Sequence, residues 1–181
     1  MAQERQDNTV DECLHPSNVN YCRLYVDWIT PKVYGRVCDL GSGIGYPTLK
    51  YAEKDNVSEV ITNDKYYEEG KTIKHAKILR YVETTEDFLK RDLGQFDCIT
   101  CTEHIEHLEM QTQLDLLNWV KKYLKDGGLF LGSMPNVDRS INPFHIQEYT
   151  HKQWHAILKR HFKHADVVLL NNDLYVWIAH N

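Results

Sequence analysis

The stretch Val37-Cys38-Asp39-Leu40-Gly41-Ser42-Gly43-Ile44-Gly45 decides the fold that we expect for this chain. It begins as the apolar end of a buried strand, and a helix with a proline in its first turn follows at Tyr46-Pro47-Thr48-Leu49. Glycines at alternate positions permit positive φ angles and let a ligand approach the main chain. The free N–H groups of the helix face the same place, so the turn is predicted to hold a ligand. A tight connection without a ligand is the alternative.

The spacing of the glycines distinguishes two classes of nucleotide-binding fold. The G-x-G-x-x-G pattern of nicotinamide and flavin folds requires glycine at position 46, where this chain has tyrosine. The pattern present is Asp-x-Gly-x-Gly-x-Gly, which resembles motif I of the class I S-adenosylmethionine-dependent methyltransferases. In that family the acidic residue lies near the methionyl end of the cofactor. The resemblance implies that S-adenosylmethionine is bound by Asp39, Gly41, Ser42, Gly43 and Gly45.

Length and composition favour one globular domain over residues 1–181. The chain is 42% apolar and 26% charged, with a net charge of −5, so no global basic surface suggests nucleic acid. We expect residues 1–12 to be mobile, residues 15–30 to form an N-terminal helix and residues 34–179 to form the core.

The cysteines and the apolar segments bear on the cellular compartment. The cysteine count of five is odd and suggests no disulfide framework. Cys98 and Cys101 lie in a predicted strand, where residues three apart point to opposite faces, so core packing is favoured over zinc binding. We find neither a signal core nor an apolar stretch long enough for a bilayer, and we predict no membrane partner and a cytoplasmic location.

Strand and helix patterns alternate along the chain. Strands are predicted at 58–63, 78–82, 96–101, 129–134, 165–170 and 174–179, and helices at 46–54, near 67–76, at 84–91, at 110–124 and after Thr150. In the helix at 110–124 the predicted core stripe is Met110, Leu114, Leu117, Val120 and Leu124. The fold class is α/β: a Rossmann-like, doubly wound, seven-stranded, mostly parallel sheet with an antiparallel C-terminal hairpin, as in the methyltransferases that the chain resembles.

Two acidic residues follow predicted strands and are candidate ligand contacts. Asp64 comes after the second strand, where a carboxylate can accept hydrogen bonds from both ribose hydroxyls of a nucleoside. Glu103 follows the strand at 96–101. Ligands bind at the carboxyl ends of strands in open α/β sheets, so we predict that Asp39 and Glu103 face one crevice.

The segment Glu103-His104-Ile105-Glu106-His107 carries the candidate catalytic groups. If it turns helically, Glu103, Glu106 and His107 share a face and His104 points away. Removal of a proton from a hydroxyl acceptor requires a base or a metal, and His107 and His145 are the candidates for either role. A structural role in bridging loops is the alternative for each histidine.

The resemblance covers residues 34–179 and includes two branches. The order of motifs resembles ubiquinone-biosynthesis O-methyltransferases and many small-molecule or sugar methyltransferases. The Glu-x-x-Glu-His pattern also resembles the 3′-terminal small-RNA 2′-O-methyltransferases, which hold a divalent metal. By that resemblance the metal ligands would be Glu103, Glu106, His107 and His145. Glu-His in this place also recurs in metal-free relatives, so we predict no metal and retain the four-ligand site as the alternative.

These observations predict a methyltransferase that uses S-adenosylmethionine and transfers its methyl group to a hydroxyl or amine of a small molecule or sugar. One alternative is a metal-assisted RNA 2′-O-methyltransferase, and RNA is then the partner. Another is a non-catalytic protein that binds S-adenosylmethionine. The acceptor, the methylated atom and the oligomeric state are left open by the sequence.

Overall fold

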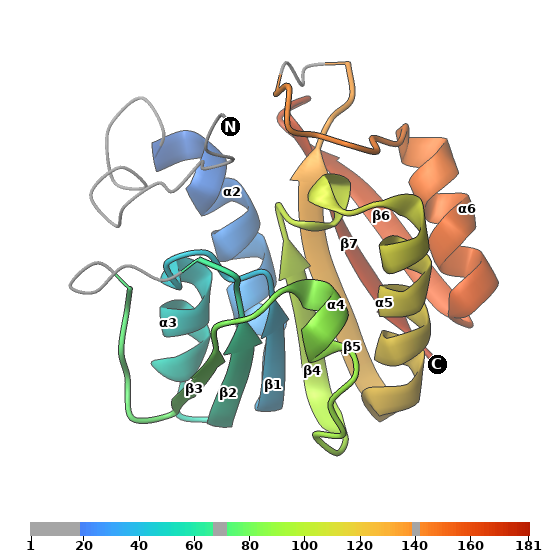
Figure 1. The fold of residues 1–181 in the computed structure, drawn as a ribbon. Coiled ribbons are helices and arrows are strands. Elements are labelled where there is room, and N and C mark those ends of the chain that lie inside the picture. Colours follow the sequence, from blue (N-terminus) through green and yellow to red (C-terminus); the bar gives the residue numbers. More distant parts are fainter. Residues whose placement is uncertain (1–18, 67–71, 139–141) are drawn as a thin grey trace.

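Seven strands form one sheet in the computed structural model, which describes residues 19–66, 72–138 and 142–181 (Figure 1). The strands are β1 (Gly35–Leu40), β2 (Val57–Asn63), β3 (Ile78–Tyr81), β4 (Phe96–Thr102), β5 (Leu124–Pro135), β6 (His164–Leu170) and β7 (Leu174–His180). Their order in the sheet is β3-β2-β1-β4-β5-β7-β6. The first five strands run parallel, and β7 is antiparallel to both β5 and β6. The predicted fold class is confirmed.

Helices cover both faces of this sheet (Figure 1). They are α2 (Val19–Ile29), η1 (Thr30–Lys32), α3 (Tyr46–Ala52), α4 (Thr85–Phe88), η2 (Ile105–His107), α5 (Met110–Tyr123) and α6 (His151–His161). Two apolar clusters form the core. One joins α2 and α3 to the sheet, and the other joins α4, α5 and α6 to it. None of the helices in the described part of the chain is long and apolar enough to cross a membrane.

The central strand β4 contributes to both clusters because its side chains alternate between the faces of the sheet. Cys98 belongs to the cluster under α2 and α3, and Cys101 belongs to the cluster under α5. Both thiols are fully buried, and burial raises their pKa values. The prediction that these cysteines are core residues is confirmed.

Local sequence signals account for several element ends. The hydroxyl of Thr150 accepts a hydrogen bond from the Gln153 N–H, and the Gln153 side chain bonds back to the Thr150 N–H, which completes a capping box at the start of α6. The turn between β6 and β7 places Asn171 and Asn172 at positive φ, a conformation that asparagine tolerates. The terminal hairpin forms as predicted.

Three predictions about helices need correction. The helix expected at 84–91 is shorter, since α4 ends at Phe88. In the helix expected near 67–76, residues 72–76 are not helical, and residues 67–71 lie outside the described part of the chain. The segment 1–12, expected to be mobile, and the predicted helix start at 15–18 also lie outside it. Met110 and Leu114 are exposed, whereas the later part of the predicted stripe, Leu117 and Val120, is buried together with Gln113.

Candidate active site

The glycine-rich turn lies at the carboxyl end of β1 and leads directly into α3. Gly41, Gly43 and Gly45 have φ angles of +66°, +54° and +100°, which residues with a side chain rarely adopt. The N–H of Ser42 donates to the carbonyl of Asn63 at the end of β2, which ties the turn to the neighbouring strand. The main chain of this turn is therefore placed at the ligand-binding edge of the sheet.

Asp39 does not face the crevice, so the prediction that it does is wrong. Its side chain is fully buried, and its two carboxylate oxygens accept hydrogen bonds from the hydroxyls of Thr48 and Thr100. Burial raises the pKa of the Asp39 carboxyl to about 6, and the two hydroxyl donors oppose that shift. Asp39 thus holds α3 and β4 to β1 from beneath the turn.

Asp64 lies where the sequence places it, at the end of β2 and beside the glycine turn. One of its oxygens accepts a hydrogen bond from the N–H of Gly43 at 2.7 Å, and the other accepts one from the N–H of Tyr66 at 2.9 Å. The guanidinium of Arg80 donates to the Gly43 carbonyl at 2.8 Å. Each carboxylate oxygen can accept a second hydrogen bond, so Asp64 retains capacity for hydroxyl groups of a ligand. Its contact with ribose stays a prediction.

The segment after β4 is not a continuous helix. Glu103 has a φ of +49°, which turns the chain before the single turn of η2 begins at Ile105. The Glu103 carboxylate accepts a hydrogen bond from the hydroxyl of Ser133 on β5 at 2.7 Å. The expected helical spacing of Glu103, Glu106 and His107 is therefore wrong, because Glu103 has a positive φ and lies outside the single helical turn of η2.

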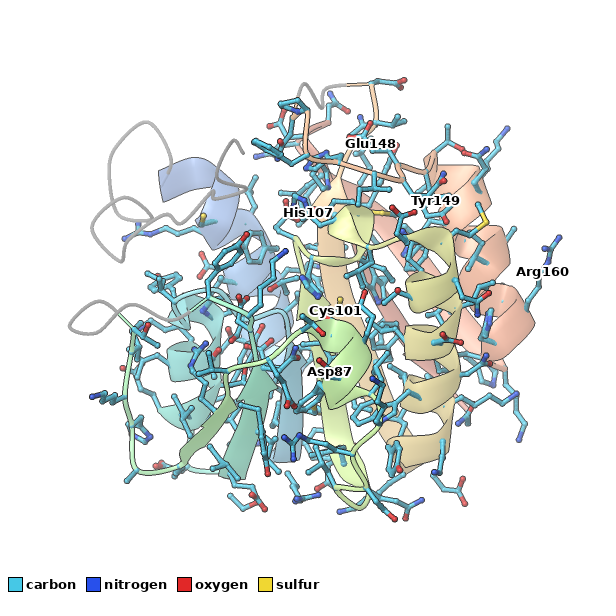
Figure 2. All side chains as sticks on the ribbon, viewed as in Figure 1. Asp87, Cys101, His107, Glu148, Tyr149 and Arg160 are labelled. Atoms are coloured by element: carbon cyan, nitrogen blue, oxygen red, sulfur yellow. The ribbon has the colours of Figure 1, made fainter. Side chains whose placement is uncertain are left out.

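Glu106, His107 and His145 come together at this edge. One ligand atom of each lies within 4.8 Å of those of the other two, and the rings of His107 and His145 are 4.8 Å apart between centroids. Of the four metal ligands in the alternative prediction, these three are grouped and Glu103 is not among them. Figure 2 labels His107 and Glu148, which lie near the carboxyl ends of the central strands.

The rings of His107 and His145 are each oriented by a hydrogen bond that involves Nδ1. Nδ1 of His107 lies 3.1 Å from the carbonyl oxygen of Phe144, and Nδ1 of His145 lies 2.5 Å from a carboxylate oxygen of Glu148. A carbonyl and an ionised carboxylate accept only, so we assign the proton to Nδ1 in both rings. Nε2 is then the basic nitrogen of each neutral imidazole.

Glu106 is an unusual carboxylate. It is 1% exposed, and no described donor forms a hydrogen bond to either of its oxygens. Burial raises the pKa of the Glu106 carboxyl well above its ordinary value, and the nearby Glu103 adds to this shift. A buried carboxyl without donors is neutral, or it binds a cation.

His104 is not part of the cluster of Glu106, His107 and His145, and its ring lies against the glycine turn. A Cβ built on Gly41 would be 2.0 Å from Cγ of His104, so the ring packs on the bare glycine. Nε2 of His104 lies 2.8 Å from the hydroxyl of Thr85. Burial lowers the pKa of the His104 imidazole to about 4.

Two supporting residues escaped the sequence reasoning. Glu148 follows His145 by three residues, a spacing that could have suggested the pair. Gln113 is 2% exposed in α5, where its side chain donates to the carbonyls of Ile105 and Leu108 and accepts from the Tyr149 hydroxyl. The sequence carries no signal for Gln113, because a glutamine on an amphipathic helix is usually exposed.

Comparison with known families fixes the identity of the fold. The family model of the methyltransferase domain matches residues 17–172. This chain belongs to the methyltransferase family. The comparison with curated proteins finds no sequence match.

Solved structures resemble this methyltransferase in fold at low sequence identity. A DhpI complex with SAH has a TM-score of 0.73 at 11% identity, over 96% of this chain and 91% of DhpI. The N-methyltransferase NodS from Bradyrhizobium japonicum WM9 has a TM-score of 0.70 at 15% identity, over 92% of this chain and 98% of NodS. An O-methyltransferase family protein from Burkholderia thailandensis has a TM-score of 0.68 at 11% identity, over 93% of this chain and 61% of that protein.

The edge of the sheet in this methyltransferase thus carries two adjoining sets of groups. The first is the glycine turn with Asp64, which offers main-chain and carboxylate contacts to a ligand. The second is the cluster of Glu106, His107 and His145, which offers two oriented imidazoles beside a buried carboxyl. Such a pair of sites suits a reaction between two bound molecules.

Proposed function

We propose that this methyltransferase transfers the methyl group of S-adenosylmethionine to a hydroxyl, or an amine, of a small molecule or sugar. The observation that carries the proposal is the placement of the Asp64-bound glycine turn and the histidine cluster at one edge of the sheet. Several structural neighbours are described with this cofactor or its product: DhpI with SAM and with SAH, and NodS with S-adenosyl-L-homocysteine.

In this proposal the cofactor lies along the carboxyl ends of β1 and β2. Asp64 accepts hydrogen bonds from the ribose hydroxyls, and the main chain of the turn contacts the rest of the molecule. The turn residues are Gly41, Ser42, Gly43 and Gly45. Glu103 borders the site from β4, where Ser133 holds its carboxylate. In this proposal Asp39 supports the turn from within the core, where its side chain is fully buried.

The reaction requires alignment of the acceptor and removal of its proton. S-adenosylmethionine supplies an electrophilic methyl group when it is bound, so the chain's own residues need only orient the acceptor, exclude water and accept a proton. His107 or His145 accepts the proton of the acceptor at Nε2, since Nδ1 of each ring is assigned as a donor. Glu148 holds the His145 ring in this orientation through its hydrogen bond with Nδ1.

Charge favours a small acceptor over RNA. The cluster is bordered by the carboxyl groups of Glu103 and Glu148, and the chain carries a net charge of −5. Carboxylates repel the phosphates of a nucleic acid, which binds through lysine and arginine. DhpI, NodS and the Burkholderia thailandensis protein therefore offer better analogies than an RNA enzyme.

Methyl transfer into a cell extract tests the proposal. Purified protein with S-adenosylmethionine carrying a labelled methyl group should transfer label to a small, dialysable compound, and His145→Ala should lower the rate by about 10²–10⁴-fold. Label in an RNA fraction would favour the RNA alternative. Cofactor binding without any transfer, over extracts of several sources, would favour the non-catalytic alternative.

A second candidate, metal-assisted transfer, is favoured by Glu106. The two buried oxygens of Glu106 have no described hydrogen-bond donor. One ligand atom each of Glu106, His107 and His145 lies within 4.8 Å of the other two, which is close enough for all three to bind one ion. Each ring also bonds through Nδ1 to a carbonyl or carboxylate, which is the usual arrangement around metal-binding histidines. Two imidazoles and one carboxylate suit Mn²⁺, Fe²⁺ or Zn²⁺. The residues therefore fit a metal, which would polarise the acceptor hydroxyl.

Calorimetry with Mn²⁺ separates the two candidates. If the cluster binds metal, wild-type protein takes up one equivalent, Glu106→Gln takes up none, and a chelator removes methyl transfer until Mn²⁺ is restored. If the cluster acts as a base, the chelator has no effect and Glu106→Gln retains most of its activity. Asp115→Asn, an exposed change on α5, is the matched control.

A further inference from the structure

The side chain of His104 joins three strand ends at the cofactor edge. It extends from the residue after Glu103 at the end of β4, and its ring covers the α-carbon of Gly41 at the end of β1. Nε2 bonds to Thr85, the first residue of α4, which follows β3. Glycine at position 41 is thus required by an internal side chain, and not only by a ligand.

The surroundings of His104 place it between the two halves of the proposed site. Its ring packs on the glycine turn that Asp64 holds at Gly43, and its main chain belongs to the same short segment as His107, a candidate base. Thr85 is 4% exposed, so its hydroxyl is largely removed from water and the hydrogen bond to His104 is protected. This bond connects the start of α4 to the segment that follows β4 and restricts both of them.

We propose that His104 is a positioning residue of the cofactor site, which holds the glycine turn in its ligand-ready conformation through its contact with Gly41 and its hydrogen bond to Thr85. This inference rests on the proposed function. Ligands bind at the carboxyl ends of the strands, and His104 fixes three of those ends relative to one another. Without it, binding would have to order the turn, and this cost would appear as lost affinity.

A double-mutant cycle on the hydrogen bond tests the inference. His104→Phe keeps a flat ring on Gly41 but removes the nitrogen, and Thr85→Val keeps the shape of threonine but removes the hydroxyl. Calorimetry with S-adenosylhomocysteine should show each variant binding about 5–10-fold more weakly, with the double variant no weaker than the weaker single variant. Thr85→Ser, which retains the hydroxyl, should bind within about twofold of wild type. His161→Phe on the outer helix α6 is the matched control and should bind as wild type does.

The possible results distinguish this inference from the proposed function. Failure of the wild-type chain to bind S-adenosylhomocysteine would overturn the proposed function and the inference with it. Normal wild-type binding with unchanged affinity in both folded single variants, or with losses that add in the double variant, would overturn the inference alone. If His104→Phe does not fold, the inference is tested by comparing the affinities of Thr85→Val and Thr85→Ser for S-adenosylhomocysteine. Equal affinities in that pair would contradict the positioning role of His104.

Discussion

Gly41 is a residue at which backbone strain and side-chain packing can be separated. Both Gly41 and Gly127 have a positive φ, +66° and +75°, but an added Cβ meets the His104 ring at Gly41 and nothing within 4 Å at Gly127. We expect Gly127→Ala to lower the free energy of unfolding by about 1 kcal/mol through strain alone. Gly41→Ala should lower it by about 2–4 kcal/mol, because overpacking adds to strain. Urea denaturation measures both, and equal losses would contradict the close packing of His104.

Asp64 is the residue on which cofactor affinity should depend most. Its carboxylate holds the N–H groups of Gly43 and Tyr66, and in the proposed function it also accepts the ribose hydroxyls. Hydrogen bonds to a charged group contribute about 1.5–3 kcal/mol each. Asp64→Ala should therefore weaken binding of S-adenosylhomocysteine at least about tenfold by calorimetry. The exposed Asp55→Ala is the control, and unchanged affinity in folded Asp64→Ala would refute the assignment.

Glu148 is expected to matter for turnover and not for cofactor binding. Its carboxylate accepts the hydrogen bond from Nδ1 of His145 at 2.5 Å, so it fixes the orientation and the tautomer of the ring. Glu148→Gln keeps the shape but loses the charge. We expect kcat to fall about 10–100-fold while the affinity for S-adenosylhomocysteine is unchanged. A variant with wild-type kcat would show that His145 needs no such partner.

At the scale of elements, the site depends on two loops that are joined to each other. The N–H groups of Ile146 and Gln147 donate to the carbonyl of Glu106, and Gln113 links η2 to Tyr149. These bonds hold the segment that carries His107 beside the segment that carries His145. The relative position of the two histidines is therefore set by main-chain bonds and by α5.

Gln113→Leu should loosen this arrangement. The change leaves the buried carbonyls of Ile105 and Leu108 without their donor, at a cost of about 1–3 kcal/mol in the free energy of unfolding. Methyl transfer should fall as well, because the histidines lose their fixed separation. Gln111→Leu, an exposed change on the same helix, should cost less than about 0.5 kcal/mol in the same denaturation experiment.

The strands were predictable from sequence and the loops were not. Buried parallel strands have a direct signature in apolar runs, which is why β2 and β4 were expected within one residue of their ends. The strand expected at 129–134 begins earlier, since β5 starts at Leu124. The turn after β4 has no such signature. Glu103 has a positive φ there and bonds to Ser133 of β5, thirty residues later in the chain, so helical spacing did not describe its position.

At the scale of the whole molecule, the buried Asp39 links stability to pH. The pKa of its carboxyl is about 6 in the folded state, against an ordinary value of 3.8. The folded chain holds this proton where the unfolded chain releases it, so the contribution of Asp39 to stability is full below about pH 4 and is lost as the pH rises to about 6.

Asp39→Asn, which cannot titrate, makes this contribution measurable. Between pH 7.5 and pH 5, the free energy of unfolding of the wild type should rise relative to that of Asp39→Asn by about 1–2 kcal/mol. The buried Glu106 is present in both proteins and cancels in the comparison. Urea denaturation at the two pH values provides the measurement. A constant difference between the proteins would mean that Asp39 is ionised throughout.

The identity of the family was predictable because the glycine pattern, its leading aspartate and the order of strands all reflect one topology. The buried position of Asp39 was not predictable, because its hydrogen-bond partners are the hydroxyls of Thr48 on α3 and Thr100 on β4. The pairing of His145 with Glu148 and of His104 with Thr85 likewise arises from tertiary contacts. Sequence patterns located the edge of the sheet at which the site lies. The structure then identified the hydrogen-bond partners of the residues at that edge.

Binding of S-adenosylhomocysteine to the wild-type chain and to Gly43→Val is the measurement that tests the central claim most directly. Gly43 has a φ of +54°, and its N–H bonds to Asp64, so a β-branched side chain would disturb the turn at the proposed cofactor site. By calorimetry, the wild type should bind one equivalent, and folded Gly43→Val should bind none. Absence of binding by the wild type, or undiminished binding by Gly43→Val, would contradict the claim that this turn holds the cofactor.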